Sequence, residues 1–415
     1  MILLSHPTAN QNVRQTALAF ADAHLLREFW TGVNWKRDSL LDRLAGFSPR
    51  IRSELRRRSF APELAPFIRT DPAREWLRLV AEQLGWKRLT RDEHALFSVD
   101  AVYQSLDRRV AERIASGLTI KAVYAYDDGA LATFRAARER GIRCVYEHPV
   151  VSWRIVRQLQ QEEAELHPEW APTLGALRDS EEKLARKDEE LALADLVVTA
   201  SSFARESVLR APKLNAPVAV IPYGTHGATG IRPGRSSQGK LRVLFVGALS
   251  QAKGLGYALE AVERLGGEAE FTLIGRRVSP MVPAPAVLDK YRWLPSLPHD
   301  ELLREMSRHD VLLFPSLHEG FGLVMTEAMS QGLVVITTPH TAGPDLISDG
   351  ADGFIVPIRS SAAIEEKLAL LLHDPERLRA LQEAAREKAR TLTWENYRQR
   401  LLHLAREVVD TPVES

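Results

Sequence analysis

Two glutamates, Glu319 and Glu327, stand eight residues apart on either side of a glycine-rich turn. The turn follows the apolar run Val311–Ser316, which is typical of a buried strand. A strand, a glycine turn and a helix start together make an anion site, because glycine lets the backbone approach a ligand and the first helical N–H groups point at it. The glutamates cannot bind phosphate, but they can accept hydrogen bonds from hydroxyl groups. The stretch therefore predicts a ligand with both phosphate and hydroxyl groups, such as a nucleotide-sugar.

Each residue of this stretch has an expected role. Glu319 would accept from sugar hydroxyls and Glu327 from a ribose diol. The alternative is that Glu319 is an acid favoured by the helix dipole and Glu327 a solvated helix residue. The backbone N–H groups expected to face phosphate are those of Gly320, Phe321, Gly322 and Leu323.

Other loops at predicted strand ends supply candidate cations. Gly247 ends one strand, and Lys253 follows it as a point charge suited to a diphosphate. Arg276 follows the strand Phe271–Gly275, where it could contact a phosphate or a base. Either residue could equally be an ordinary loop cation. The loop Thr338–Ile347 could close over the donor or simply precede a helix.

The N-terminal half offers a histidine and a polar loop. His148 ends the strand Cys144–His148, where it could hold a sugar hydroxyl or move a proton, or serve the structure alone. Asn10, Asn12 and Arg14 could face an acceptor or the donor phosphate, or could take part in turn and N-cap chemistry. We name these three as the acceptor-side candidates.

The pair Asp127–Asp128 follows a strand and invites a metal–diphosphate interpretation. Capping of the helix that begins near Ala130 is the simpler explanation. The chain has no Gly-x-x-x-x-Gly-Lys-Ser/Thr loop, no paired-cysteine metal spacing and no Gly-x-Ser-x-Gly nucleophile elbow. These absences give no argument for a nucleoside triphosphate, a cysteine-bound metal or a serine nucleophile.

The elements that must position these residues alternate between strand and helix. This pattern predicts parallel sheets with right-handed crossovers, which bind ligands at the carboxyl ends of their strands. The first strand is Ile2–Ser5, a helix is expected over Val13–Leu26, and residues 36–118 look like a helical, irregular insertion. The fold class is α/β, with two doubly wound Rossmann-like domains that face a central cleft. The expected divisions are an N-terminal acceptor-side domain (1–224), a linker (225–240), a nucleotide-sugar domain (241–390) and a C-terminal helix (391–415).

Composition narrows the class of protein. The chain has 415 residues, enough for two domains, and a formal net charge of +1, which gives no argument for a nucleic-acid partner. Cys144 is the only cysteine, so no intrachain disulfide can form. The residues at Met1–Leu4 are too few for a signal peptide, and no apolar run approaches the ~20 residues of a membrane span. We expect a cytoplasmic protein.

One local excess of charge stands out. The segment Arg50–Phe60 holds five arginines against Glu54 alone, beside several leucines and phenylalanines. It is either a solvated helix face or a basic amphipathic patch for anionic lipid or an acidic acceptor. The second possibility predicts peripheral contact with the inner face of a membrane. The arginines are Arg50, Arg52, Arg56, Arg57 and Arg58.

Together the motifs resemble the donor-binding signature of family 4 retaining glycosyltransferases, glycosyl transferases group 1, which have the GT-B fold. The resemblance rests on residues 311–357 and on the segment from Val246 to Gly254, and is weak before residue 120. It implies that Glu319 contacts donor sugar hydroxyls, Glu327 the ribose and Lys253 the diphosphate. It also places His148 where the family has a sugar-contacting histidine, so that Glu319, His148 and Lys253 are the catalytic candidates. It further implies that the C-terminal helix (391–415) crosses back to the N-domain.

The chain departs from the family pattern at three places. Ala248 stands where the family usually has an arginine, so one diphosphate contact is missing and Arg276 or Arg14 would have to replace it. The loop at Ala9–Gln11 lacks the usual glycine pair. Arg276 and Arg277 replace the end of a Gly-x-Gly.

The resemblance implies transfer of a sugar from a nucleoside diphosphate to an acceptor hydroxyl, with retained configuration. The nucleoside-diphosphate-sugar is a substrate in this reaction, and we expect no metal and no cofactor. The acceptor would be a saccharide, a lipid-linked molecule or a small molecule. Two rivals stay open: a nucleotide-sugar epimerase of related fold, which needs no acceptor, and a degenerate donor-binding subunit, favoured by Ala248.

Overall fold

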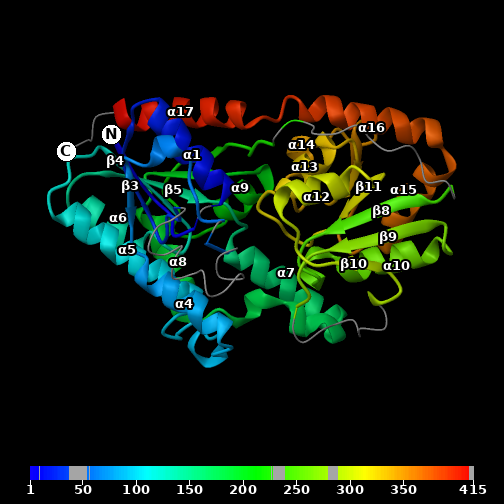
Figure 1. Ribbon diagram of the computed structural model, residues 1–415, viewed down its shortest axis with the longest axis horizontal. Helices are drawn as coiled ribbons and strands as arrows, with labels where there is room; N and C mark the ends of the chain where they lie inside the picture. Colours follow the sequence, from blue (N-terminus) through cyan, green and yellow to red (C-terminus); the bar gives the residue numbers. More distant parts are fainter. Residues whose placement is uncertain are drawn as a thin grey trace.

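The computed structural model describes residues 1–8, 10–36, 54–55, 57–225, 227, 239–278 and 288–410. Within these residues the strands form two parallel sheets, of seven and six strands, which lie side by side with helices on both faces (Figure 1). The first sheet has the order β3-β2-β1-β4-β5-β6-β7 and the second β10-β9-β8-β11-β12-β13. The predicted fold class, two Rossmann-like α/β domains, is therefore confirmed.

The central strands are short apolar runs because helices cover both faces of each sheet. All four residues of β1, β6, β11 and β12 are buried. The first-sheet strands are β1 (Ile2–Ser5), β2 (Leu26–Thr31), β3 (Ile68–Thr70), β4 (Ala122–Tyr126), β5 (Arg143–His148), β6 (Leu196–Thr199) and β7 (Val218–Val220). The second-sheet strands are β8 (Leu241–Val246), β9 (Ala269–Ile274), β10 (Arg292–Leu294), β11 (Val311–Phe314), β12 (Val334–Thr337) and β13 (Gly353–Ile355).

Most helices connect one strand of a sheet to the next strand in the chain. Those up to the end of the first sheet are α1 (Gln11–Asp22), α4 (Ala73–Gln83), α5 (Val99–Ala115), α6 (Leu131–Arg138), α7 (Trp153–Leu166), α8 (Glu181–Leu193) and α9 (Ser202–Leu209). The later ones are α10 (Leu255–Arg264), α12 (His299–Met306), α13 (Leu323–Ser330), α14 (Gly343–Leu346), α15 (Ser361–His373), α16 (Pro375–Ala389) and α17 (Trp394–Asp410). Short 3₁₀ turns lie at Pro62–Leu64, Lys87–Leu89, Pro168–Thr173, Gly175–Arg178 and Gln251–Lys253.

Two strands of the first sheet, β2 and β3, were not predicted from the sequence. The helix expected to reach Leu26 ends at Asp22, and Leu26 instead begins β2. The strand was not predicted because Glu28, a buried acid, interrupts its apolar sequence pattern. Arg113 of α5 neutralises Glu28 at 2.7 Å. The segment expected to be helical also contains β3, a three-residue strand at the edge of the sheet.

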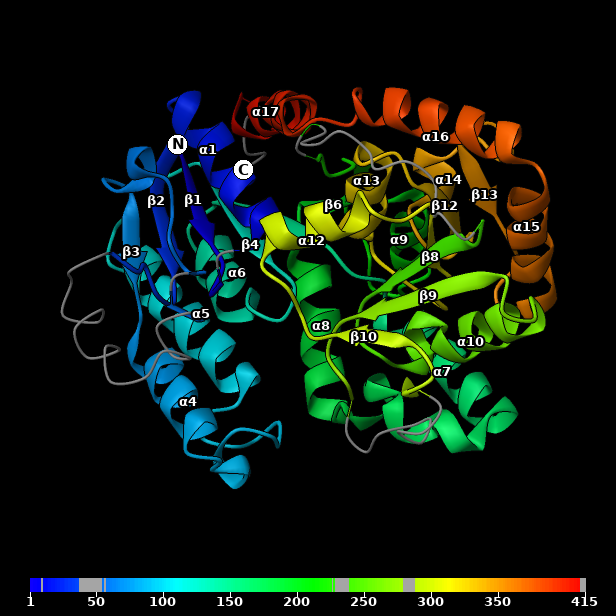
Figure 2. The ribbon, with the colours of Figure 1, turned by 45° about the vertical axis from the view of Figure 1, so that its right-hand side comes forward.

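Two helices cross between the halves of the molecule (Figure 2). α17 leaves the second domain and packs on α1, where the hydroxyls of Tyr397 and Thr16 lie 2.8 Å apart. In the other direction, α7 leads to Trp170, which is buried in the core of the second domain. The relative position of the two sheets is therefore fixed by packed side chains as well as by the connecting chain.

Cys144 is fully buried in β5, and burial raises the pKa of its thiol to about 12, as suits a core residue. Of the expected linker, residues 226 and 228–238 lie outside the described part of the chain. No helix among the described residues is both long and apolar enough to cross a membrane.

Candidate active site

The glycine turn before α13 lies directly against the end of β5. A Cβ atom added to Gly320 would lie 1.9 Å from the carbonyl oxygen of Pro149. The hydroxyl of Ser201 donates to the Gly320 carbonyl at 2.6 Å. Only glycine fits at this position, and the two domains meet here backbone to backbone.

The rest of the turn leaves the start of α13 without a side-chain cap. Gly322 has φ 89°, a left-handed conformation that favours glycine, and no side chain caps the helix there. Phe321 is buried and packs edge-to-face on Tyr223. Leu323 is partly buried against the same core. The turn thus holds the N-terminus of α13 at the domain interface.

A cavity of about 300 Å³ lies beside Gly320, and it brings together three residues that the sequence analysis named as catalytic. His148 comes from the end of β5, while Lys253 and Glu319 come from the second domain. The ammonium group of Lys253 forms an ion pair with the carboxylate of Glu319. Both side chains keep about a quarter of their surface exposed, so a ligand can reach them.

Asp127 holds the histidine side of this cavity. Its Oδ1 lies 3.2 Å from Nδ1 of His148, and its Oδ2 lies 2.8 Å from Nζ of Lys187. Burial alone would raise the pKa of Asp127, but the ammonium group of Lys187 and the neighbouring imidazole of His148 outweigh it and hold the pKa well below its usual value. Both ring nitrogens of His148 are buried and neither makes a hydrogen bond among the described residues, so Nδ1 lies close to Asp127 without a well-aligned hydrogen bond and Nε2 has no partner. A hydroxyl group entering the cavity could supply one.

The capping role predicted for Asp127 and Asp128 is wrong. Two carboxylates from distant helices accept the N–H groups at the start of α6 instead. Glu190 of α8 accepts from Ala130 at 3.1 Å and from Leu131 at 3.3 Å. Asp107 of α5 accepts from Ala132 at 2.7 Å and from Thr133 at 2.8 Å. Burial and the charge of Asp127 raise the pKa of Glu190 to about 8.

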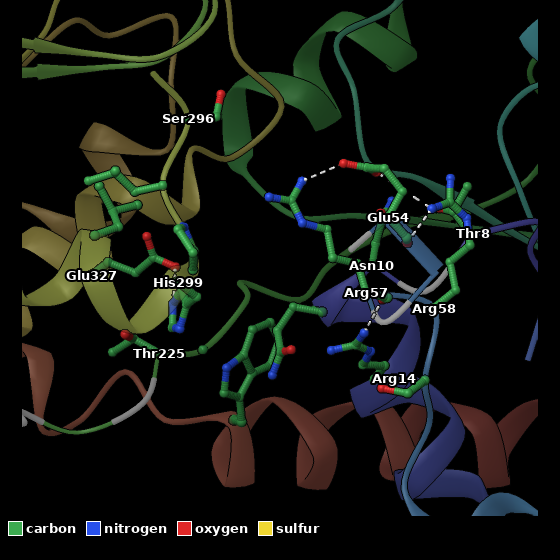
Figure 3. A pocket seen from close by; sticks show the side chains of 17 residues that line it. Thr8, Asn10, Arg14, Glu54, Arg57, Arg58, Thr225, Ser296, His299 and Glu327 are labelled. Atoms are coloured by element: carbon green, nitrogen blue, oxygen red, sulfur yellow. Dashed lines mark hydrogen bonds and ion pairs between the residues drawn. The ribbon is translucent and has the colours of Figure 1, made fainter. Parts of the chain in front are cut away.

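A second cavity, of about 710 Å³, opens between the domains on the other side of the turn (Figure 3). Figure 3 shows Glu327 and His299 on the wall from the second domain and Arg14, Arg57 and Arg58 on the wall from the first. The two cavities share no lining residue. The other residues that line the larger cavity are Thr8, Asn10, Gln11, Glu54, Ser59, Gly224, Thr225, Ser296, Leu297, Pro298, Leu302 and Trp394.

Glu327 is paired on its own wall. Nε2 of His299 lies 3.0 Å from its Oε1. This hydrogen bond raises the pKa of His299 more than its partial burial lowers it. The carboxylate that the sequence assigns to a ribose therefore already has a titratable partner.

Other candidates are placed differently. Asn12 is buried inside the first domain, where it donates to the hydroxyl of Tyr223 at 3.1 Å. Arg276 is exposed and lines neither cavity. Gly247, with φ 154°, packs against Gly275, where a Cβ would lie 1.8 Å from the Gly247 carbonyl oxygen.

The loop Thr338–Ile347 contains the short helix α14 and reaches the first domain. Its Asp345 accepts from the backbone N–H of Ser202 at 2.8 Å. The ring of His340 stacks on Phe203 with 4.5 Å between the centroids. The loop thus joins the domains next to Glu319, whose backbone N–H donates to the His340 carbonyl at 2.9 Å.

The basic segment is described only in part, because Arg50, Arg52 and Arg56 lie outside the described residues. Arg58 is buried and pairs with Glu75 at 2.5 Å. Arg57 lines the larger cavity. These two arginines therefore face the interior of the domain and the cavity, and membrane contact by the segment stays a prediction.

Several lining residues carried no signal in the sequence. Lys187 lies in a charged helix that reads as solvated, and His299 reads only as a helix start. His318 could have been noticed, since it precedes Glu319. Burial and the charge of Lys253 lower its pKa to about 4, and Gln160 lies 2.9 Å from its Nε2.

Comparisons with known proteins match most clearly over the second domain. Residues 231–388 match the family model described as "Glycosyl transferases group 1". The amylovoran biosynthesis glycosyltransferase AmsK of Erwinia amylovora is 30% identical over 165 residues, 36% of this chain and 40% of AmsK. The D-inositol 3-phosphate glycosyltransferase of Corynebacterium urealyticum is 32% identical over 123 residues, 30% of this chain and 29% of that protein. The match thus spans less than half of either relative.

Solved structures resemble the whole chain. Sucrose-phosphate synthase from Thermosynechococcus elongatus superposes with a TM-score of 0.68 at 17% identity, covering 99% of both chains. Anabaena HepE in complex with UDP-glucose superposes with a TM-score of 0.60 at 13% identity, covering 98% of this chain and 99% of HepE. These likenesses identify the two-domain arrangement as the GT-B fold.

Proposed function

We propose that the protein transfers a sugar from a nucleoside diphosphate to an acceptor hydroxyl with retained anomeric configuration, as an enzyme of family 4. One observation carries the proposal: His148, Lys253 and Glu319 line a single cavity beside the glycine turn. Glu327 lies in α13, after the turn, and lines the larger cavity. The match of residues 231–388 and the UDP-glucose named for HepE support a nucleotide-sugar donor.

In this proposal the donor crosses the turn, with its ribose at Glu327 and its sugar at Glu319. The bond from the anomeric carbon to the diphosphate oxygen breaks, and a bond from that carbon to the acceptor oxygen forms on the same face. The proton of the acceptor hydroxyl passes to the departing phosphate oxygen. Lys253 and the N–H groups of α13 stabilise the charge that develops on the diphosphate, so no metal is required.

His148 would hold a sugar hydroxyl through its unpaired Nε2. Asp127 would act as a positioning residue, because it lies against Nδ1 and is kept ionised by Lys187. An ionised Asp127 favours the tautomer that carries its proton on Nδ1, which leaves Nε2 to accept a hydrogen bond. This arrangement would fix the sugar ring relative to the leaving group.

The proposal is tested with a panel of nucleoside diphosphates and their sugars. Thermal shift identifies the base, and a transfer or hydrolysis assay with each stabilising nucleotide-sugar identifies the donor. Stabilisation and turnover by one nucleotide-sugar are expected. A protein that neither binds nor consumes any of them is not a sugar transferase of this kind.

A degenerate donor-binding subunit is the alternative with a specific observation behind it, since Ala248 stands where an arginine is expected. It predicts donor binding without turnover. An epimerase predicts turnover without any acceptor. The acceptor class, the cytoplasmic location and contact of Arg50–Phe60 with a membrane remain predictions, and flotation with anionic vesicles tests the last.

A further inference from the structure

The larger cavity contains an arginine without a counter-ion. Arg14 lies in the first turn of α1, and its Nη2 donates to the carbonyl of Arg57 at 2.5 Å. Its Nε is buried and has no hydrogen-bond partner, and no carboxylate pairs with Arg14 among the described residues. Burial lowers the pKa of the Arg14 guanidinium. A half-buried cation that lacks a partner is unfavourable until an anion arrives.

The neighbouring Arg58 differs from Arg14 in having carboxylate partners, although the Nε atoms of both arginines are buried without a hydrogen bond among the described residues. Arg58 is buried against Glu75 at 2.5 Å, and a second acid, Glu54, lies 3.6 Å away. Among the described residues Arg57 has only Glu54, at 3.3 Å, and both of these side chains are exposed. An exposed pair of this kind stabilises the fold little. Arg58 therefore serves the fold, while Arg57 remains available to a ligand.

The wall opposite does not supply the missing negative charge. Glu327 is paired with His299 at 3.0 Å. The first turn of α1 contains no acid, so nothing there competes for Arg14. The cation assigned to the diphosphate, Lys253, lies in the smaller cavity, paired with Glu319. Arg14 and Arg57 therefore lie in a different cavity from Lys253, the residue assigned to the diphosphate.

We propose that Arg14 and Arg57 form an anion subsite on the first-domain wall of the larger cavity, and that it binds a phosphate group. Guanidinium groups suit phosphate because their planar N–H groups donate in pairs. Two sources share this chemistry: the diphosphate of the donor, for which Arg14 would replace the arginine missing at Ala248, and a phosphorylated acceptor. The role of the subsite in sugar transfer rests on the proposed function, but anion binding is measured without it.

The experiment is isothermal titration at low salt with wild type, Arg14→Gln, Arg57→Gln and the control Arg109→Gln. Arg109 is an exposed arginine of α5 that lines neither cavity, so it matches the loss of charge. The probes are inorganic phosphate, the nucleoside diphosphate that best stabilises the wild type, and the corresponding nucleoside. Circular dichroism checks folding, and Arg14→Lys keeps the charge without the fork.

We expect Arg14→Gln to weaken phosphate binding at least tenfold and Arg57→Gln several-fold, with Arg109→Gln unchanged and Arg14→Lys intermediate. If the phosphate belongs to the donor, both variants weaken the nucleoside diphosphate but not the nucleoside. If it belongs to an acceptor, nucleoside diphosphate affinity is unchanged, and inorganic phosphate still binds the nucleotide-saturated wild type but not the variants.

The subsite is overturned if wild type binds phosphate in neither setting, or if Arg14→Gln and Arg57→Gln bind as tightly as Arg109→Gln. Should Arg14→Gln fail to fold, the exposed Arg57 decides alone. Phosphate binding that depends on Arg14 in a protein that binds no nucleotide would uphold the subsite and reject the donor assignment. If the protein turns over a nucleotide-sugar while Arg14→Gln and Arg57→Gln bind phosphate like the wild type, the proposed function stands and the subsite is rejected.

Discussion

The two cavities at the domain interface differ in how their charges are balanced. In the smaller cavity Lys253 is paired with Glu319, and Asp127 is paired with Lys187 and lies beside His148. In the larger cavity Glu327 is paired, but Arg14 has no carboxylate partner among the described residues. The charged groups of the smaller cavity are thus held in place before any ligand binds. In the larger cavity the guanidinium of Arg14 is still able to pair with an anion.

Paired and unpaired charges contribute to catalysis and to ligand binding in different ways. Paired groups hold one another in place, so a transition state meets them without rearrangement. An unpaired cation instead gains most when an anion replaces its lost water. We therefore expect changes in the smaller cavity to act on turnover and changes in the larger cavity to act on ligand affinity.

The largest effect should come from the ion pair of the smaller cavity. We expect Lys253→Ala and Glu319→Gln each to lower kcat at least 100-fold, about 2.7 kcal/mol, because the charge on the diphosphate or the contact to the sugar is lost. Steady-state transfer kinetics measure this. The control Lys290→Ala removes an exposed lysine whose partner is Glu263, and it should keep full activity. Full activity in either cavity variant would reject its role.

The contact between the domains beside the smaller cavity is broken by Gly320→Ala. The added Cβ meets the Pro149 carbonyl, and overpacking of this kind costs about 2 kcal/mol. We expect transfer to fall about 30-fold and Tm to drop, because the domains can no longer meet at the turn. Gly175→Ala is the matched control, since no atom lies within 4 Å of its added Cβ. Equal behaviour of the two variants would show that the close contact is unimportant.

The positioning of His148 is tested with Asp127→Asn. An amide cannot compensate Lys187, which among the described residues then keeps only Asp128, at 3.0 Å, so we expect a loss of stability of up to about 3 kcal/mol in denaturant titrations. We also expect kcat to fall about tenfold with the donor KM nearly unchanged. His148→Gln should lower kcat as much in either background if Asp127 acts only on stability. Non-additive losses in this double-mutant cycle would confirm that Asp127 acts through His148.

The smallest effect is a pH dependence in the larger cavity. The pKa of His299 is raised by Glu327, so their ion pair is complete below about pH 6.5 and is lost as the pH rises through the raised value. Loss of the proton frees Glu327, and we expect nucleoside affinity to increase a few-fold between pH 6 and pH 8. His299→Gln should flatten this slope in titration calorimetry. An unchanged slope would place the titrating group elsewhere.

The sequence predicted the second domain better than the first. The strands β8, β11 and β12 and the turn before α13 read directly from apolar runs ended by glycine or proline, because both faces of these strands are buried. β2 was missed because its buried Glu28 depends on Arg113, far along the chain. Glu319, Lys253 and His148 could be named because each follows a recognisable strand end.

What the sequence alone determined is the local chemistry: a glycine turn able to receive phosphate, glutamates on both sides of it and a lysine at a strand end. These follow from short-range rules of backbone conformation and helix termini. Only the tertiary structure decided which charges meet. It gave the cap of α6 to Glu190 and Asp107, placed Asp127 beside His148, and left Arg14 with buried N–H and no carboxylate among the described residues. Pairing of charges depends on distances between segments far apart in the chain, and no local pattern encodes those distances.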